Sequence, residues 1–529
     1  MQDAQLEALS PFELSLYLQK HVVDPKRQQV LDAGRGNPNW TAPVPREAFF
    51  LLGEFATQET QQGGLTGTMV MPAADRLARF LAFLQTRPGA GSTFLEQLLA
   101  LSATDLGMPA AAWLDAACDA IIGDNYPAPA RCLPVCEHPL KAYLQQNLFG
   151  QAAPAFDVFP VEGGTAGICY LFDTLINTHL LEPGARIALL LPTFAPYLEI
   201  TKLPQYHFDV VAIRSTQTRA AGRTTYHYPA VELDKLRDPL VTAVFVVNPS
   251  NPTANALGAA NIRQIQTIVN EARPDLMILT DDVYGTFASG FQSLFAVLPR
   301  NTVCLYSFSK YFGATGWRVG AIAMAQDNVF DRLLQRLPPA QAATVAARYA
   351  AVTSDAPLPF IDRLVADSRD IALNHAAGLS AVQQVMIALF SLYGCLVDGA
   401  AYQAEVMAIC RTREKQLFAT LGLPLPETRH DTAYYCELDL MAWIQARYGQ
   451  AFAAFVKTRY SPRQLLVQLA ADENVMLLQT RDFGSHPWAV RISLANLATR
   501  QYAQIGARLI HWMDDLQVTW ANKRGQSNE

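Results

Sequence analysis

Five short apolar runs between residues 186 and 325 constrain the fold of this chain more than any other feature of its sequence. Each run is nearly continuous, which is typical of strands buried on both faces of a parallel sheet. Between two of the runs, Ile262, Ile265, Ile268 and Val269 have helical spacing, and Pro274 closes that segment. This alternation predicts an α/β fold with a wound, mostly parallel sheet. The runs are "RIALLLP" (186–192), "VTAVFVVNP" (241–249), "LMILTDD" (276–282), "NTVCLYSFS" (301–309) and "RVGAIAMA" (318–325).

Polar residues stand at the ends of three consecutive runs. "NPSNPT" (248–253) ends the run 241–249, "TDDVY" (280–284) ends the run 276–282, and "SFSK" (307–310) ends the run 301–309. Ligands of wound α/β sheets bind beyond the carboxyl ends of the strands, where these segments would meet. The order of the segments therefore predicts one site built from all three.

Lys310 is the reactive residue that we expect at the centre of this site. It lies in "YSFSKYFGATGWRVG", among hydroxyls and glycines, with Arg318 eight positions later. A positioned lysine amine can attack a carbonyl to form a Schiff base, and pyridoxal 5′-phosphate is the commonest cofactor that supplies one. The sequence thus predicts a pyridoxal phosphate site in which the freed amine of Lys310 also acts as general base.

The other groups that such a site requires have candidates along the chain. Asp281 suits the ring nitrogen, Tyr284 and Asn251 could reach the O3′ oxygen, and Phe194 could stack on the ring. A phosphate is held by amides at a helix start, by hydroxyls and by arginine. "EGGTAG" (162–167) precedes a helical run, so the predicted phosphate ligands are Gly163, Gly164, Thr165, Ser307 and Arg318.

Each of these motifs also has a purely structural interpretation. "GGTAG" alone is more often a tight turn, and "NPSNPT" alone is a turn with a helix cap. Phe194 alone would be core, Asp281 alone an acidic strand end, and Lys310 alone a surface lysine. Their joint occurrence, in this order and on consecutive strand ends, favours the cofactor site.

Composition excludes several other classes of protein. The 529 residues exceed the usual size of a single core, and the formal charge of −6 comes without a basic stripe, which argues against nucleic-acid binding. We see no signal peptide and no apolar stretch of about 20 residues, so we expect a cytoplasmic protein. The eight cysteines form no CxxC pair and read as reduced thiols. Cys132 and Cys136 with His138 are too few for zinc, so no metal is expected.

The series of motifs resembles the fold-type-I pyridoxal phosphate enzymes of the aspartate aminotransferase superfamily. That family has a serine three residues before the Schiff-base lysine and an arginine eight after it, which Ser307, Lys310 and Arg318 match. Its conserved asparagine matches Asn251, and its D-x-x-Y matches Asp281 and Tyr284. The resemblance implies the fold-type-I transferase fold, with a large domain and a smaller α+β domain.

The resemblance also assigns residues that the strand ends do not reveal. Arg491, in "VRISLA", matches the small-domain arginine that binds the substrate α-carboxylate. Tyr126, in "GDNYPAP", matches the tyrosine that reaches the phosphate of the neighbouring subunit. The resemblance therefore implies a homo-oligomer, at least a dimer, and larger assemblies such as a dodecamer.

Two departures from an ordinary aminotransferase narrow the resemblance. First, a helical block across roughly 50–120 lengthens the interval between "DAGRGNPNW" (32–40) and Tyr126. Second, Arg35 stands beside Gly36 within "DAGRGNPNW". With strings such as "DLMILTDDVYGTF" and "FIDRLVADSR", these features are similar to the aspartate 4-decarboxylases. That group implies removal of the β-carboxylate of L-aspartate through imine and enamine intermediates, giving L-alanine and CO₂ with side transaminase activity. The alternative is an aspartate or aromatic aminotransferase without significant decarboxylation.

Arg35 and Tyr284 complete the predicted catalytic set with Lys310. Binding the departing carboxylate tightly would stabilise the ground state, so we expect Arg35 to orient cofactor or substrate instead. The predicted substrate ligands are Arg491, Arg35, Gly36 and Asn251, and keto acids are expected as further ligands.

Four segments are expected. Residues 1–50 form an N-terminal arm with part of the small domain, and 51–120 a helix-rich insertion. Residues 121–395 form the large cofactor-binding domain, and 396–529 the small α+β domain. A regulator built on an aminotransferase-like module would need a basic helix-turn-helix, which neither terminus offers.

Overall fold

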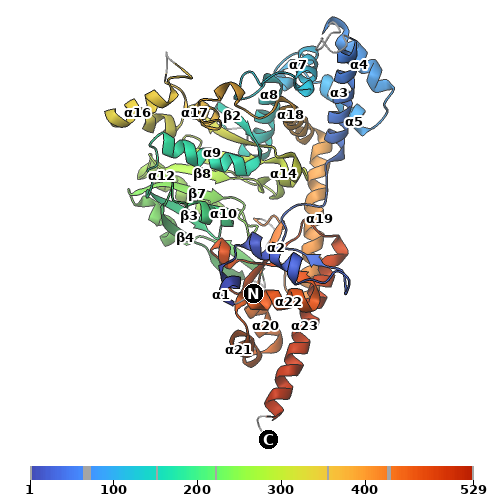
Figure 1. Ribbon diagram of the computed structural model, residues 1–529, viewed down its shortest axis with the longest axis vertical. Helices are drawn as coiled ribbons and strands as arrows, with labels where there is room; N and C mark the ends of the chain where they lie inside the picture. Colours follow the sequence, from blue (N-terminus) through green and yellow to red (C-terminus); the bar gives the residue numbers. More distant parts are fainter. Residues whose placement is uncertain are drawn as a thin grey trace.

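The computed structural model describes residues 3–62, 73–150, 153–220, 223–353, 357–425 and 430–526. Its centre is a seven-stranded sheet with the order β2-β10-β9-β8-β7-β3-β4 (Figure 1). β10 pairs antiparallel with β2 and β9, and the other pairs are parallel. The strands are β2 (Phe156–Val161), β3 (Arg186–Leu191), β4 (Asp209–Arg214), β7 (Val241–Val247), β8 (Met277–Asp281), β9 (Thr302–Ser307) and β10 (Gly320–Ala325).

The five predicted strands are confirmed as β3, β7, β8, β9 and β10. The apolar runs are continuous because both faces of the sheet are covered. On β7, Val244 and Val246 pack with helix α12 (Ala259–Glu271), whereas Phe245 and Val247 pack with helix α9 (Gly163–Asn177). β2 and β4 were missed. β4 forms the exposed edge of the sheet, and its intermediate burial explains why "DVVAIR" carries no continuous apolar signal.

A second region combines the N-terminal segment with the C-terminal part of the chain. Strand β1 (Leu31–Asp32) pairs parallel with β12 (Val475–Met476). Beside them lies a three-stranded sheet in the order β11-β14-β13. The long helices α19 (Val397–Leu421) and α23 (Thr499–Gln526) pack against each other along this region (Figure 1). The sheet strands are β11 (Tyr435–Asp439), β13 (Leu478–Gln479) and β14 (Ala489–Ser493).

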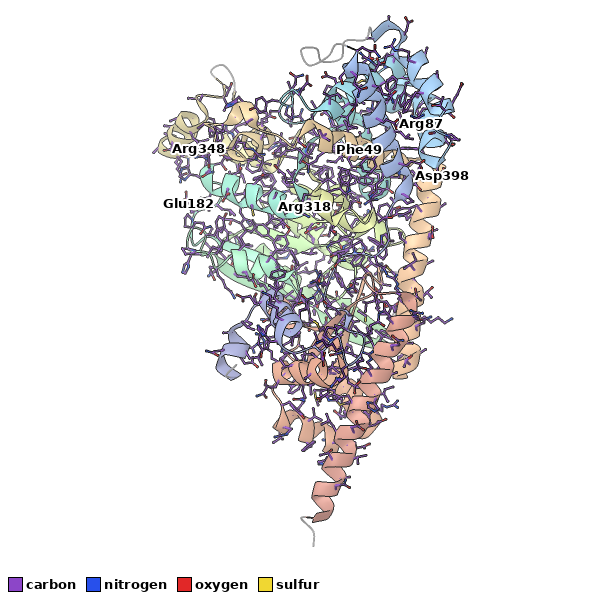
Figure 2. All side chains as sticks on the ribbon, turned by 45° about the vertical axis from the view of Figure 1, so that its right-hand side comes forward. Phe49, Arg87, Glu182, Arg318, Arg348 and Asp398 are labelled. Carbon is purple, nitrogen blue, oxygen red and sulfur yellow. The ribbon has the colours of Figure 1, made fainter. Side chains whose placement is uncertain are left out.

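The predicted helix-rich block is formed by α3 (Pro43–Gln61), α4 (Arg76–Gln85), α5 (Ala90–Leu99), α6 (Ala103–Leu106) and α7 (Ala110–Ile122). α3 and α7 contact α18 (Ala381–Cys395), and Figure 1 shows α3, α4, α5 and α7 together at one end of the molecule. The block is held by buried aromatic residues, including Phe49, Phe55 and Trp113, of which Phe49 is labelled in Figure 2. The division into four segments at 50, 120 and 395 remains a proposal.

Within the described ranges, no single helix is long and apolar enough to cross a membrane. Ala381–Cys395 and Asp398–Leu421 meet that test only as a pair, bent by 87°.

Candidate active site

A cavity of about 270 Å³ lies at the carboxyl ends of β7, β8 and β9, where the strand order placed the site. Residues from the sheet, from α9 and from the small C-terminal sheet converge on it. Most of the predicted site residues line it: Gly36, Gly164, Thr165, Phe194, Asn251, Asp281, Tyr284, Ser307, Lys310, Arg318 and Arg491. Segments that are more than 400 residues apart along the chain therefore meet in one cavity.

Asp281 ends strand β8 with its carboxyl group buried in this cavity. Burial raises the pKa of Asp281 to about 6, while hydrogen bonds from the backbone N–H of Val283 and the hydroxyl of Tyr197 lower it. The two donors lie 3.2 Å and 3.3 Å from the carboxylate oxygens. Tyr197, on α10 (Ala195–Ile200), was missed because only the fold brings it to Asp281.

Lys310 lies on a one-turn helix, α14 (Phe308–Tyr311), directly after β9. Ser307 caps this helix by accepting a hydrogen bond from Ser309 N–H. Burial lowers the pKa of Lys310, which favours the neutral, nucleophilic amine. Its Nζ lies 3.4 Å from the carbonyl oxygen of Gly36, so the amine faces the N-terminal segment across the cavity.

The predicted phosphate ligands surround the first turn of α9. The helix begins at Gly163, and Gly164 and Thr165 of that turn line the cavity. Gly163 has φ +81°, and a Cβ there would lie 2.5 Å from Arg318 Nη2. Unpaired N–H groups at a helix start, hydroxyls and a guanidinium form an anion site, so these residues fit a phosphate.

Arg491, on β14, also lines the cavity and is only 5% exposed. Its guanidinium donates to Asn251 Oδ1 at 3.0 Å and to the carbonyl of Gly34 at 2.6 Å. It also stacks against Tyr435 and Phe483, with its Cζ 4.4 Å and 5.1 Å from the ring centres. Such a buried and oriented guanidinium can bind a carboxylate through two hydrogen bonds.

Two tyrosines that sequence reasoning missed, Tyr434 and Tyr435, lie beside the predicted Tyr284. The hydroxyls of Tyr284 and Tyr435 lie 2.9 Å apart, and Tyr434 donates to the Gly36 carbonyl at 2.8 Å. Tyr434 and Tyr435 occur in "DTAYYCELDL" at the start of a strand, where no motif distinguishes them from core residues. Burial raises the pKa of Tyr284 well above its usual value.

Three predicted site residues lie outside the lining of this cavity. Arg35 contacts Asp32 at 3.3 Å and the side-chain oxygen of Gln19 at 3.0 Å. Gly163 is the first residue of α9 and is in close contact with the guanidinium of Arg318. Tyr126 is 70% exposed and has its ring 6.0 Å from that of His375.

Arg35 lines a second, outer cavity of about 630 Å³. This outer cavity shares Gly36, Phe194 and Arg491 with the inner one, so the two adjoin. Its opposite wall is helix α2 (Pro11–His21), through Phe12 and Leu16. The outer cavity therefore lies beside the end of the inner cavity that contains Arg491.

The chain is similar to known proteins over most of its length. The sequence profile of the aminotransferase class I and II family matches residues 159–391. The chain is 43% identical, over 521 residues, to a bifunctional aspartate aminotransferase and L-aspartate beta-decarboxylase from Pseudomonas sp., covering 97% of both chains.

Solved structures share the fold at low sequence identity. The aromatic aminotransferase of Pyrococcus horikoshii OT3 is 16% identical, with a TM-score of 0.56 and coverage of 95% of this chain and 99% of that one. The aspartate aminotransferase of Thermotoga maritima is 15% identical, with a TM-score of 0.53 and coverage of 97% and 100%. The fold-type-I architecture expected from the sequence is confirmed.

Proposed function

This chain belongs to the class I and II aminotransferase family. We propose that it decarboxylates L-aspartate at the β-carboxylate, giving L-alanine and CO₂. Aspartate transamination is proposed as its secondary activity. The observation that carries the proposal is the near full-length similarity to a bifunctional enzyme with both activities. The cavity that joins Lys310, Asp281 and Arg491 supports it.

The enzyme depends on pyridoxal 5′-phosphate, and the residues of the inner cavity fit this cofactor. When bound, the cofactor supplies a carbonyl carbon for the lysine amine and an electron-accepting ring. Gly163, Gly164, Thr165, Ser307 and Arg318 would hold its phosphate. Asp281 would hold the ring nitrogen, Asn251 and Tyr284 would reach O3′, and Phe194 would cover the ring face.

The residues of the chain then divide the work on the substrate. Arg491 binds the α-carboxylate. Its hydrogen bonds to Asn251 and Gly34 already hold the guanidinium in place before the substrate arrives. Lys310, with its lowered pKa, takes up the proton from the α-carbon and returns it at the end of the cycle. Asp281, as a carboxylate, holds a proton at the ring nitrogen.

Arg35 is proposed to orient the substrate rather than to clamp the departing carboxylate. Its guanidinium is already engaged by Asp32 and Gln19, and its side chain is 54% exposed. A charge shared with Asp32 and exposed to water binds a second carboxylate only weakly, so the carboxylate can lose its charge at little energetic cost. The partition between alanine and keto acid then depends on how the substrate is held.

Tyr126 is proposed to serve the phosphate of a neighbouring subunit, which makes the functional unit at least a dimer. Its exposure and its position outside the cavity of its own chain support this role. Assembly into larger oligomers and the cytoplasmic location expected from the sequence remain predictions.

Proton NMR of the purified protein with L-aspartate and pyridoxal phosphate, without a keto acid, tests the function. Alanine equal to the aspartate consumed, over many turnovers, is the expected result. Oxaloacetate that forms only after 2-oxoglutarate is added, with no alanine, would instead establish an aminotransferase without decarboxylation.

A further inference from the structure

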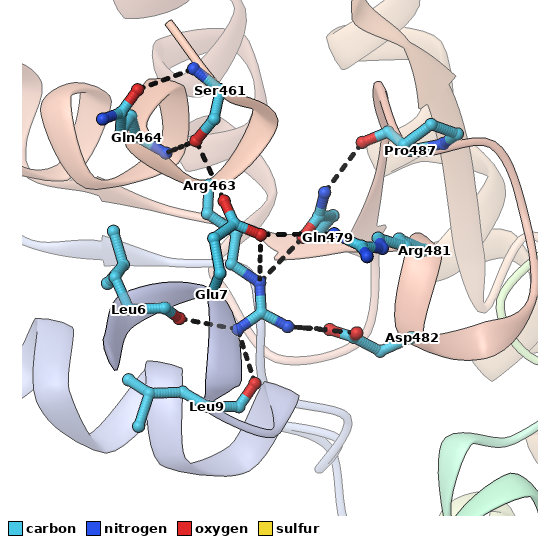
Figure 3. Close-up of polar contacts among 10 residues, drawn as sticks. All are labelled: Leu6, Glu7, Leu9, Ser461, Arg463, Gln464, Gln479, Arg481, Asp482 and Pro487. Carbon is cyan, nitrogen blue, oxygen red and sulfur yellow. Dashed lines mark hydrogen bonds and ion pairs between the residues drawn. The ribbon is translucent and has the colours of Figure 1, made fainter. Parts of the chain in front are cut away.

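Arg463 is a buried arginine outside both cavities, and it makes an unusually complete set of contacts. It lies on α22 (Pro462–Glu473) and is 2% exposed. Its guanidinium donates to the carbonyls of Leu6 at 2.8 Å and Leu9 at 2.5 Å, and to both carboxylate oxygens of Asp482 at 3.0 Å and 2.9 Å (Figure 3). Its Nε donates to Gln479 at 3.1 Å. Every nitrogen of the guanidinium therefore has a partner.

The two carbonyls bound by Arg463 end the first helix of the N-terminal segment. Glu7 adds to this attachment by accepting a hydrogen bond from Ser461 Oγ at 2.9 Å and pairing with Arg481 at 3.2 Å. Helix α2 begins immediately afterwards, with Ser10 as its cap. The start of α2 is thus held on α22 by hydrogen bonds.

Helix α2 brings this attachment to the outer cavity. Phe12 and Leu16 form part of its wall, and Gln19 donates to Asp32 at 3.0 Å while accepting from Arg35 at 3.0 Å. Displacement of α2 would therefore move both the apolar wall and one of the two partners of Arg35.

The carboxylate bound by Arg463 leads to the inner cavity. Asp482 belongs to the turn η8 (Arg481–Phe483), and Phe483 is one of the two rings that stack on the Arg491 guanidinium. The carbonyl of Phe483 accepts from Thr193 N–H at 2.8 Å, next to Phe194 in both cavities. Asp482 therefore holds the turn that supports the carboxylate-binding arginine.

We propose that Arg463 is a positioning residue of the active site: it ties the N-terminal segment and the Arg481–Phe483 turn into one unit, which fixes α2 beside Arg35 and Phe483 against Arg491. The inference rests on the proposed function for its substrate, but not for its geometry. Lys310 and Asp281 lie on the sheet and do not belong to this unit. Loss of Arg463 should therefore impair substrate binding more than the chemical steps.

Arg463→Met in the full-length holoenzyme tests this role, and Arg273→Met is a matched control. Arg273 is 3% exposed and binds the carbonyls of Leu236, Asp238 and Val241 together with Asp275, at the amino ends of β7 and β8. It thus has the same kind of partners at the edge of the sheet remote from the cavities.

We expect Arg463→Met to raise the KM for L-aspartate about tenfold, with kcat changed less than about threefold, because small displacements of binding groups weaken binding steeply. The same variant should raise the dissociation constant of succinate, which binds without turnover, and should speed tryptic cleavage at Lys20. Arg273→Met should lower thermal stability without these effects.

Wild-type KM, succinate affinity and cleavage rate in Arg463→Met would overturn the proposal, as would equal shifts in Arg273→Met. If Arg463→Met does not fold, the same measurements are made on Asp482→Asn, which removes the charge of the carboxylate bound by Arg463. An unchanged KM for L-aspartate in Asp482→Asn would refute the role. Failure of the proposed function is separate, since it would appear as absence of alanine with the wild-type enzyme, while the succinate and cleavage measurements remain decisive.

Discussion

Asp281 shows how single neighbours tune a reactive group in this site. Burial raises its pKa to about 6, whereas the N–H of Val283 and the hydroxyl of Tyr197 stabilise its charged form. In the role that we propose for Asp281, its carboxylate form holds the protonated ring nitrogen of the cofactor, so cofactor affinity should fall as the pH drops through about 6. Tyr197, which no motif marked, is therefore expected to set the lower pH limit of cofactor binding.

Tyr197→Phe tests this dependence. The loss of one hydrogen bond to a charged group costs about 1.5 kcal/mol, so the dissociation constant of pyridoxal phosphate should rise about tenfold. The pH at which affinity declines should also move upward, because the variant raises the pKa of Asp281 further. Fluorescence titration with the cofactor between pH 5 and pH 8 measures both effects.

Tyr206→Phe is the matched control, because Tyr206 donates to Asp173 on α9, away from the cavity. It should leave the affinity and its pH profile unchanged. An unshifted profile in Tyr197→Phe would show that its hydroxyl does not stabilise the Asp281 carboxylate.

The start of helix α9 is shaped by its contact with the short turn that ends at Arg318. Gly163 adopts φ +81°, and its missing side chain leaves room for the Arg318 guanidinium, which donates to Thr315 O at 3.0 Å. Arg318 itself has φ +53° at the end of a short turn. The proposed phosphate site therefore depends on two backbone conformations that are uncommon for most residues.

Gly163→Ala should weaken phosphate binding, because the new Cβ would lie 2.5 Å from Arg318 Nη2 and displace it. The expected rise in the dissociation constant of pyridoxal phosphate is about tenfold, and backbone strain should cost about 1 kcal/mol of stability. Gly184→Ala is the control, since Gly184 has φ +83° but nothing within 4 Å of an added Cβ. Equal cofactor affinities in the two variants would contradict the steric explanation.

At the scale of the whole molecule, a buried acidic pair joins the sheet to the C-terminal region. Glu414 on α19 and Asp431 are 2% and 3% exposed, with Arg411 3.2 Å from Glu414. Next to them, Thr432 N–H donates to Ala254 O at 2.9 Å, in the segment that follows the strand β7. The pair thus lies where the C-terminal region contacts the sheet.

Burial and mutual repulsion raise the pKa of Glu414, and burial raises that of Asp431, against the opposing effect of Arg411. A raised folded-state pKa favours the protonated form, so this stabilisation is complete below the ordinary glutamate pKa and is lost as the pH rises through the raised value. The free energy of unfolding of Glu414→Gln should therefore gain on that of wild type as the pH increases from 6 to 9, by on the order of 1–2 kcal/mol, which thermal melting at each pH would show as a growing difference in melting temperature.

Glu405→Gln is the control, because Glu405 is exposed on the same helix and the substitution removes the same charge. Its melting temperature should differ from that of wild type by a constant amount across this pH range. A difference for Glu414→Gln that does not grow with pH would exclude the buried pair as its source.

Much of the fold and most residues of the candidate active site could be predicted from the sequence. The strands of the central sheet are buried on both faces, so their apolar runs are continuous, and the carboxyl ends of β7, β8 and β9 must meet at one edge. For that reason the sequence alone predicts that Asn251, Asp281 and Lys310 lie close together. Arg491 was reached only through the resemblance to a family, because nothing local distinguishes an arginine on a short strand.

Local periodicity and the order of segments were enough to predict five strands of the sheet, the cofactor and the polar residues at the strand ends. The side chains that approach these residues from distant parts of the chain depend on the folded structure instead. Tyr435, Tyr197 and Arg463 reach their partners across large sequence separations, through contacts that leave no periodic signal. The environment of Arg35 is likewise set by the fold, which places Asp32 and Gln19 beside it, and the role of a charged group depends on its partners and on its exposure to water.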